Sequence, residues 1–155
     1  MIFETHELAD GTLVRLRLAR PSDSVLMQAF LEGAPDAVAR DFTFYDLHQR
    51  LIMTATTLGL GGEQIVGLAS VTFLRGGLAE MAVLVREEAR GRGLGKLLTG
   101  VVADEAVRRG ATRLKGEAPM LPLLERVGRT VRTVEDGRSV GYTRLSRAPR
   151  RRRAA

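Results

Sequence analysis

The segment Arg-Gly-Arg-Gly-Leu-Gly at residues 90–95 constrains the fold more than any other part of the chain. It follows an apolar run at residues 79–85 that is typical of a strand, and it precedes a run at residues 96–109 with the apolar spacing of a helix. Closely spaced glycines let backbone N–H groups approach a large anion, because no Cβ stands in the way. The helix start adds unpaired amides and the positive end of its dipole. The segment therefore predicts a diphosphate site, and with it a phosphorylated cofactor.

Two better-known phosphate-binding loops do not fit these glycines. A dinucleotide fingerprint needs its third glycine at position 96 or 98, where the chain has Lys96 and Leu98. A P-loop needs glycine at position 90 and serine or threonine at position 97, where the chain has Arg90 and Leu97. What remains is the pattern Arg-x-x-Gly-x-Gly at positions 90, 93 and 95. The alternative interpretation is a glycine-rich turn in front of an ordinary helix.

Composition limits the kinds of site that the chain can form. Its 155 residues are the size of one domain. With no cysteine and only His6 and His48, disulfides and thiolate metal sites are excluded, and we expect no metal cofactor. No apolar run is long enough for a membrane helix, and the first residues do not resemble a signal peptide. We therefore expect a cytoplasmic protein with no membrane partner.

Positive charge is concentrated at the end of the chain. The formal net charge is +6, and residues 147–155, which lack an apolar pattern, are rich in arginine. This predicts a folded domain at residues 1–146 and a disordered arginine-rich tail at residues 147–155. A basic tail can contact nucleic acid, but a solvated tail explains the composition as well. We do not expect nucleic acid as a partner.

Turn and cap residues predict the elements of the first third of the chain. Residues 3–8 and 12–18 flank Asp10-Gly11, which predicts a hairpin with a two-residue type I′ turn. Pro21 and the Ser-Asp pair after it predict a helix start, with Ser22 or Asp23 as the cap. A second helical region is expected over residues 35–40 and 46–52.

The remainder of the chain alternates strands, helices and glycine turns. Strands are expected at about residues 54–60, 64–73, 78–85 and 112–116, a short helix at 119–127, and a hairpin closed by Asp136-Gly137. Gly-Gly pairs between the first three strands favour an antiparallel meander. The strands at 78–85 and 112–116 are joined by a helix, so they are expected to run parallel in a right-handed crossover. The predicted fold class is α/β (an α+β mixed sheet), mostly antiparallel, with helices on both faces.

The loop pattern and this order of elements resemble the GNAT superfamily of N-acyltransferases over about residues 8–145. The stretches at residues 10–23, 79–85 and 123–128 further resemble the protein lysine acetyltransferases that modify acyl-CoA synthetases. The resemblance implies that the strands at 78–85 and 112–116 splay apart and that acetyl-CoA lies between them. The backbone of Val83, Leu84 and Val85 is then expected to pair with the pantetheine arm. The pyrophosphate is expected on Arg90, Gly91, Arg92, Gly93, Leu94, Gly95 and Lys96.

The resemblance also indicates where a base is expected. At pH 7 only about 0.04% of an ordinary lysine side chain is neutral, so a group that takes the amine proton is useful. A glutamate at the position of Glu80 serves as general base in the resembling lysine acetyltransferases. Glu117, at the end of the next strand, is the alternative base. The other interpretation of Glu80 is a strand glutamate paired with an arginine.

Three departures from the family pattern concern the general acid, the loop after the strand at 112–116, and residue 129. The tyrosine that often protonates the leaving thiolate is replaced by Leu124, and Tyr45 and Tyr142 do not fit that position. The loop at residues 115–122 is short and lacks the usual asparagine, and Arg129 replaces an aromatic residue. Four residues could line the acceptor site without being assigned to it: Asp41, Phe42, Tyr45 and His48.

The leading hypothesis is direct acetyl transfer from acetyl-CoA to an amine acceptor, a protein lysine by resemblance. One alternative is a small-molecule amine as acceptor. Another is an acyl-CoA-binding regulatory module without catalysis. A homodimer is left open, because the sequence does not fix the oligomeric state.

Overall fold

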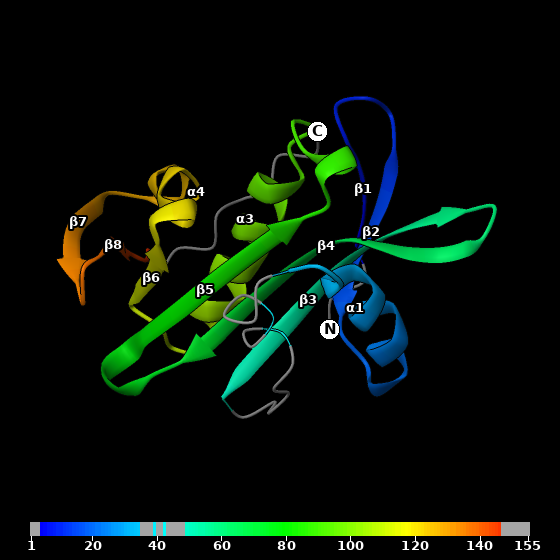
Figure 1. Cartoon of the computed structure of the whole chain (residues 1–155). Coiled ribbons are helices and arrows are strands. Elements are labelled where there is room, and N and C mark those ends of the chain that lie inside the picture. The colour runs from blue at the N-terminus through cyan, green and yellow to red at the C-terminus, as the bar shows by residue number, and fades with distance from the viewer. Residues whose placement is uncertain (1–3, 35–38, 40–41, 43–48, 147–155) are drawn as a thin grey trace.

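The computed structural model describes residues 4–34, 39, 42 and 49–146, which form one mixed sheet with helices on both faces (Figure 1). The eight strands are β1 (Glu4–Glu7), β2 (Leu13–Leu18), β3 (Arg50–Gly59), β4 (Gly62–Phe73), β5 (Leu78–Val85), β6 (Arg113–Glu117), β7 (Thr130–Glu135) and β8 (Arg138–Arg144). The α-helices of the described part are α1 (Ser24–Leu31), α3 (Leu94–Arg108) and α4 (Leu121–Val127). Short 3-10 turns are η1 (Pro21–Asp23), η2 (Arg75–Gly77), η3 (Glu87–Ala89) and η4 (Ala118–Met120).

The sheet order is β1-β2-β3-β4-β5-β6-β8-β7. Strands β3 to β5 form the predicted antiparallel meander, and β1 and β2 form the predicted hairpin, which pairs with β3 through β2. Strand β5 pairs with β6 in parallel through the crossover helix α3, as predicted. The last hairpin returns β8 antiparallel to β6 and leaves β7 at the edge. The predicted fold class is therefore confirmed.

Each face of the sheet has its own apolar core. Helices α3 and α4 cover one face, and Ala79, Met81 and Val83 of β5 point into that core. Helix α1 lies on the other face, where Ala82 and Leu84 of the same strand pack (Figure 1). This two-sided burial explains why β5 reads as a nearly continuous apolar run.

Helix α4 packs closely on β6 and β8 because two glycines face it there. Gly116 and Gly141 are direct neighbours in the β6–β8 pair. A Cβ on Gly141 would lie 2.4 Å from Leu121 Cδ2, and a Cβ on Gly116 would lie 2.8 Å from Met120 Cβ. The missing side chains therefore let η4 and α4 approach the sheet just beyond β6.

Type I′ turns were predicted at Asp136-Gly137 and at Asp10-Gly11, and the structure has such a turn at the first of these positions only. The turn at Asp136-Gly137 has the positive φ angles of a type I′ turn, 50° and 75°, as predicted. The first hairpin is instead closed by a three-residue loop, residues 9–11, in which Leu8 N donates to Thr12 O (2.8 Å) and Gly11 has φ 84°. Here one left-handed glycine is enough, because the extra residue lets a wider turn close the hairpin.

The prediction of a helical region over residues 46–52 is wrong at its end, because β3 already begins at Arg50. Leu51, Ile52 and Met53 are fully buried between the two cores, so the chain forms a central strand there. Of the predicted region at residues 35–40, only Ala39 is described, and it is helical. Residues 46–48 and the tail at residues 147–155 lie outside the described part.

Asp23 occupies the N-cap position of α1, one of the two predicted positions, but its side chain makes no capping hydrogen bond to that helix. Its carboxylate instead accepts two hydrogen bonds from the buried guanidinium of Arg17, at 2.6 and 2.7 Å, and one from the backbone of Arg20 at 2.7 Å. Glu63 at the start of β4 binds the same guanidinium at 3.0 Å. The ion pairs connect β2, the start of α1 and β4.

We expect Asp23→Asn to lower the free energy of unfolding by about 3–5 kcal/mol, because it leaves the Arg17 charge buried without its bidentate partner. Urea titration measures this loss. The pKa of Asp23 is lowered from its ordinary 3.8, first of all by the hydrogen bonds from Arg17. The stabilisation by the Arg17–Asp23 pair is therefore fully present above the ordinary pKa of 3.8, and it is lost as the pH falls through the lower pKa of the folded state.

Glu63→Gln is the control for this prediction. Its side chain is 37% exposed, so water replaces part of the lost interaction and a smaller destabilisation is expected. An equal effect of both substitutions would contradict the central role of the Arg17–Asp23 pair.

Candidate active site

Strands β5 and β6 pair over three residues and then separate. The pairs are Leu78 with Arg113, Ala79 with Leu114 and Glu80 with Lys115, after which β5 continues to Val85 without β6 beside it. Figure 1 shows the two strands diverging toward their carboxyl ends. The separation leaves part of the β6-facing backbone of β5 outside the sheet's hydrogen-bond ladder.

The exposed backbone of β5 has two partners from the loops that follow. Val83 N donates to Met120 Sδ of η4 at 3.2 Å. Val85 O accepts from Arg90 Nε, also at 3.2 Å. Both contacts come from side chains, so a ligand with its own amide groups can replace them without breaking the sheet.

The glycine loop, residues 90–96, runs from the end of η3 into the first turn of α3. Gly91 and Gly93 have φ 77° and 86°, in the left-handed region that favours glycine. The first bond of the helix runs from Leu97 N to Gly93 O (3.0 Å), so the amides of Leu94, Gly95 and Lys96 precede the helix's own hydrogen bonds. These amides and the helix dipole favour an anion at this end of α3.

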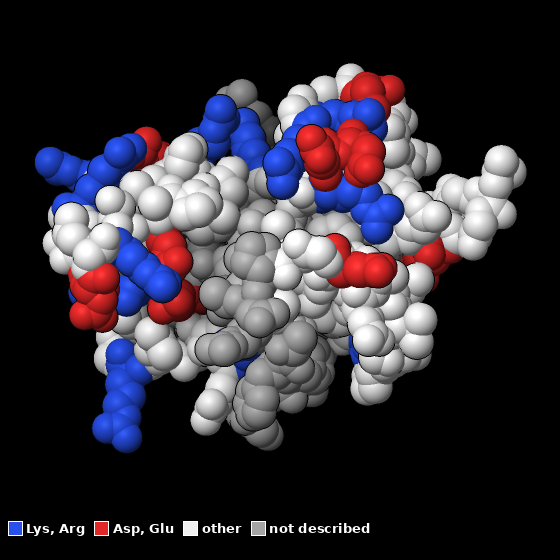
Figure 2. Space-filling view, in the orientation of Figure 1, with Lys and Arg blue, Asp and Glu red and all other residues white. Residues whose placement is uncertain are grey.

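The first hairpin contacts the glycine loop through an ion pair. Arg92 Nη1 lies 3.0 Å from Asp10 Oδ2 in the loop between β1 and β2. The pKa of Asp10 is lowered, first by the backbone amide of Thr12 and further by the nearby Arg92. Figure 2 shows basic side chains gathered beside acidic ones over the end of β5 and the loop after it. The charge at this end of the molecule is therefore mixed rather than purely basic.

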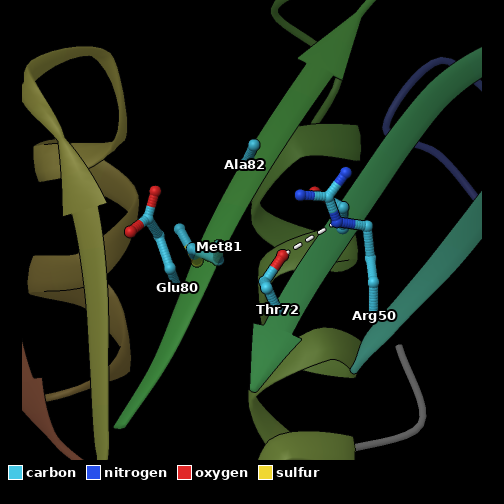
Figure 3. A pocket seen from close by; sticks show the side chains of 6 residues that line it. Arg50, Thr72, Glu80, Met81 and Ala82 are labelled. Atoms are coloured by element: carbon cyan, nitrogen blue, oxygen red, sulfur yellow. Dashed lines mark hydrogen bonds between the residues drawn. The ribbon is translucent and has the colours of Figure 1, made fainter. Parts of the chain in front are cut away.

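A small pocket of about 80 Å³ opens on the sheet face that carries α1. Six residues of β3, β4 and β5 line it: Arg50, Ser70, Thr72, Glu80, Met81 and Ala82. Arg50, Thr72 and Glu80 are register neighbours, and Arg50 Nε donates to Thr72 Oγ1 at 2.9 Å. The Glu80 carboxylate is directed toward β6 (Figure 3). A carboxylate and a guanidinium therefore border one pocket near the point where β5 and β6 part.

A second charged group borders Glu80 on the other side. Lys115, its register neighbour, binds Glu135 at 2.9 Å, and the hydroxyl of Tyr142 donates to the same carboxylate. The hydrogen bond to Glu135 raises the pKa of Lys115, and the negative charge of Glu80 contributes in the same direction. Lys115 is thus a cation held beside Glu80.

The alternative base, Glu117, does not line this pocket. It is exposed at the end of β6 and forms an ion pair with Arg138 at 3.3 Å. Among the acceptor-site candidates, Phe42 is buried in the core under α1, whereas Asp41, Tyr45 and His48 lie outside the described residues. The structure therefore brings Glu80, and not Glu117, together with the pocket.

A comparison with family models decides the relationship. The acetyltransferase (GNAT) family model matches residues 23–129. The chain belongs to the GNAT family. It is therefore a GNAT-type acyltransferase, and acyl-CoA-dependent N-acetyl transfer is the activity that the family implies. No curated protein matches the chain.

Solved structures show the same GNAT fold at low sequence identity. The GNAT domain of S. lividans PAT has a TM-score of 0.75 at 22% identity, and the match covers 92% of this chain and 97% of that one. The cAMP-binding acyltransferase from Mycobacterium smegmatis has a TM-score of 0.67 at 19% identity, over 94% of this chain and 48% of that one. The IAA acetyltransferase from Bacillus cereus has a TM-score of 0.61 at 18% identity, over 85% and 99%. This GNAT chain thus spans about half of the Mycobacterium smegmatis protein.

Two features are absent from the described part of this GNAT domain. Residues 4–34, 39, 42 and 49–146 contain no group of three or more His, Cys, Asp or Glu side chains placed to hold a metal ion. Within the same residues, no helix has the length and apolar character needed to cross a membrane.

Sequence reasoning missed Arg50, Met120 and the contacts of Lys115. Arg50 fell in a predicted helix, so its place beside Thr72 was not visible. Met120 has no charge and belongs to no motif. Lys115 could have been identified from the sequence. Once the strands at 78–85 and 112–116 are predicted to pair in parallel, a lysine in the second strand is expected near Glu80 in the first.

We expect Tyr142→Phe to raise the pKa of Glu135 toward its ordinary 4.5, because the hydrogen bond from the Tyr142 hydroxyl is the largest cause of its lowering. The Lys115 ion pair remains in this variant, so the shift is only partly reversed. Carboxyl-selective NMR titration measures the change. A pKa of Glu135 equal to that of the wild type would contradict the assigned hydrogen bond.

Proposed function

We propose that this GNAT domain transfers an acetyl group from acetyl-CoA directly to the side-chain amine of a protein lysine, with Glu80 as the general base. The observation that supports this most is the position of Glu80. It is half-buried, borders a polar pocket and lies on the last residue pair before β5 and β6 separate. The Glu80 carboxylate is therefore near both the pocket on the sheet face and the edge of β5 that β6 leaves unpaired.

The chain offers two groups of backbone atoms for acetyl-CoA, which would supply an acyl group activated as a thioester. The unpaired amides at the start of α3 suit the pyrophosphate, because no neighbouring atom lies within 4 Å of a Cβ placed on Gly91 or Gly93. The extended backbone of Val83, Leu84 and Val85 suits the amide-bearing arm. Arg90, Arg92 and Lys96 would add positive charge near the phosphates.

In this proposal Glu80 accepts the proton that the acceptor ammonium must lose, directly or through a water molecule. The pocket on the α1 face would admit the tip of the acceptor side chain, so that its nitrogen comes close to the diverging end of β5. Glu117 is less suited because it is exposed and paired with Arg138.

The charges around the pocket favour an acceptor with one amine over a polycation. Arg50 lines the pocket, and Lys115 is the register neighbour of Glu80 on β6. Together with Glu80 and Glu135, these two cations form a cluster of two positive and two negative side chains, which is not the acidic surface that a polyamine or an aminoglycoside requires. A single lysine side chain carries less charge into the pocket that Glu80 borders.

We expect Glu80→Gln to lower kcat for acetylation of a lysine peptide by about 10²–10⁴-fold, because the amide cannot take the amine proton. The KM for acetyl-CoA should change little, since Glu80 is not among the cofactor-binding residues. Steady-state kinetics with varied acetyl-CoA separate the two parameters.

Glu117→Gln is the matched control, because it makes the same chemical change on the neighbouring strand. We expect it to retain the wild-type kcat. A large loss with Glu117→Gln and none with Glu80→Gln would reverse the assignment of the base. Turnover of spermine but of no peptide or protein lysine would overturn the proposed acceptor, and CoA binding without turnover of any amine would indicate a binding module.

A further inference from the structure

The amide of Val83 has an unusual partner for a strand residue. It faces the side of β5 from which β6 has withdrawn, and it donates to the thioether of Met120 at 3.2 Å. A thioether sulfur is a weak hydrogen-bond acceptor, much weaker than a carbonyl oxygen. A buried amide without any partner costs free energy, so Met120 stabilises this part of β5 but does so poorly.

The backbone of Met120 is well placed to bring its side chain to β5. Met120 ends η4, directly after β6, and its Cβ lies 2.8 Å from the position that a Cβ on Gly116 would occupy. The side chain is partly buried and packs against the core between the sheet and α3. It therefore enters the space between the diverging strands from the side of α4.

We propose that Met120 is a gating residue for the acyl-CoA arm. Its thioether sulfur accepts the hydrogen bond of the Val83 amide until an amide carbonyl of the arm takes its place. The inference rests on the proposed function, because it uses Val83 as a contact of that arm. When the ligand enters, the N–H···S contact is exchanged for a stronger N–H···O contact, and the Met120 side chain rotates away. The displacement reduces the affinity for any ligand that carries the arm.

The gating role predicts an effect that depends on the arm of the ligand. In Met120→Ala the side chain no longer has to be displaced, so we expect CoA to bind about three- to tenfold more tightly. Adenosine 3′,5′-bisphosphate has the nucleotide end of CoA but no arm, so its dissociation constant should not change. Isothermal titration calorimetry with both compounds measures the difference.

Two further variants make the test independent of folding effects. Met120→Leu keeps the apolar bulk but removes the acceptor, and we expect a smaller increase in CoA affinity, about twofold to threefold, with faster hydrogen exchange of the Val83 amide in the free protein. Met27→Ala removes another partly buried methionine, on α1, and should leave both dissociation constants unchanged.

The outcomes separate this inference from the proposed function. If the wild type binds CoA and both Met120 variants bind it with unchanged or lower affinity, the gating role is overturned and the cofactor site stands. If affinity for the bisphosphate changes as much as that for CoA, Met120 acts on the fold and not on the arm, and gating is again overturned. If folded wild-type protein binds no CoA, the proposed function itself fails.

Discussion

The separation of β5 from β6 is the constraint on which the rest of the site depends. The parallel pairing ends at Glu80 and Lys115, and from there the β6-facing backbone of β5 needs partners from outside the sheet. Met120 and Arg90 supply them with side-chain atoms. If the two strands stayed paired to their ends, β6 would occupy these backbone groups and no extended ligand could lie along β5.

Other parts of the fold hold this opening in place. Helix α3 joins the two strands from one face, and α4 rests on the glycines of β6 and β8. On the other face, the buried ions of Arg17 and Asp23 fix the start of α1 against β2. Helices α3 and α4 therefore support the opening from one face of the sheet, while the ion pairs of Arg17 hold α1 on the other face at β2 and β4.

The parts of the fold that the sequence predicts are those with local causes. The bounds of β5, the turn at Asp136-Gly137 and the helix after the glycine loop all follow from neighbouring residues. The prediction failed where distant residues decide. β3 starts early because its apolar residues lie between two cores, and the Asp23 carboxylate binds Arg17 of β2 instead of capping its own helix.

The same distinction applies to the site. The glycine loop can be selected from a short motif, because its chemistry depends on a few adjacent residues, and Glu80 was selected through the resemblance to the lysine acetyltransferases. The partners of Glu80 cannot be selected from such a motif, because they come from β3 and β6 through sheet register. Asp10 is a further case: it was identified as a turn residue, whereas in the fold it also binds Arg92 of the glycine loop about 80 positions later.

The close contact between η4 and Gly116 has a consequence for how fast the space beside β5 can open. With its Cβ against the backbone of β6, the main chain of Met120 has little room to shift, so the sulfur can leave Val83 only by rotation about the side-chain bonds. Such rotations take picoseconds to nanoseconds in exposed side chains, and the packing of Met120 against the core slows its rotation relative to that range. Opening by this route needs a rotation of one side chain and no rearrangement of the backbone.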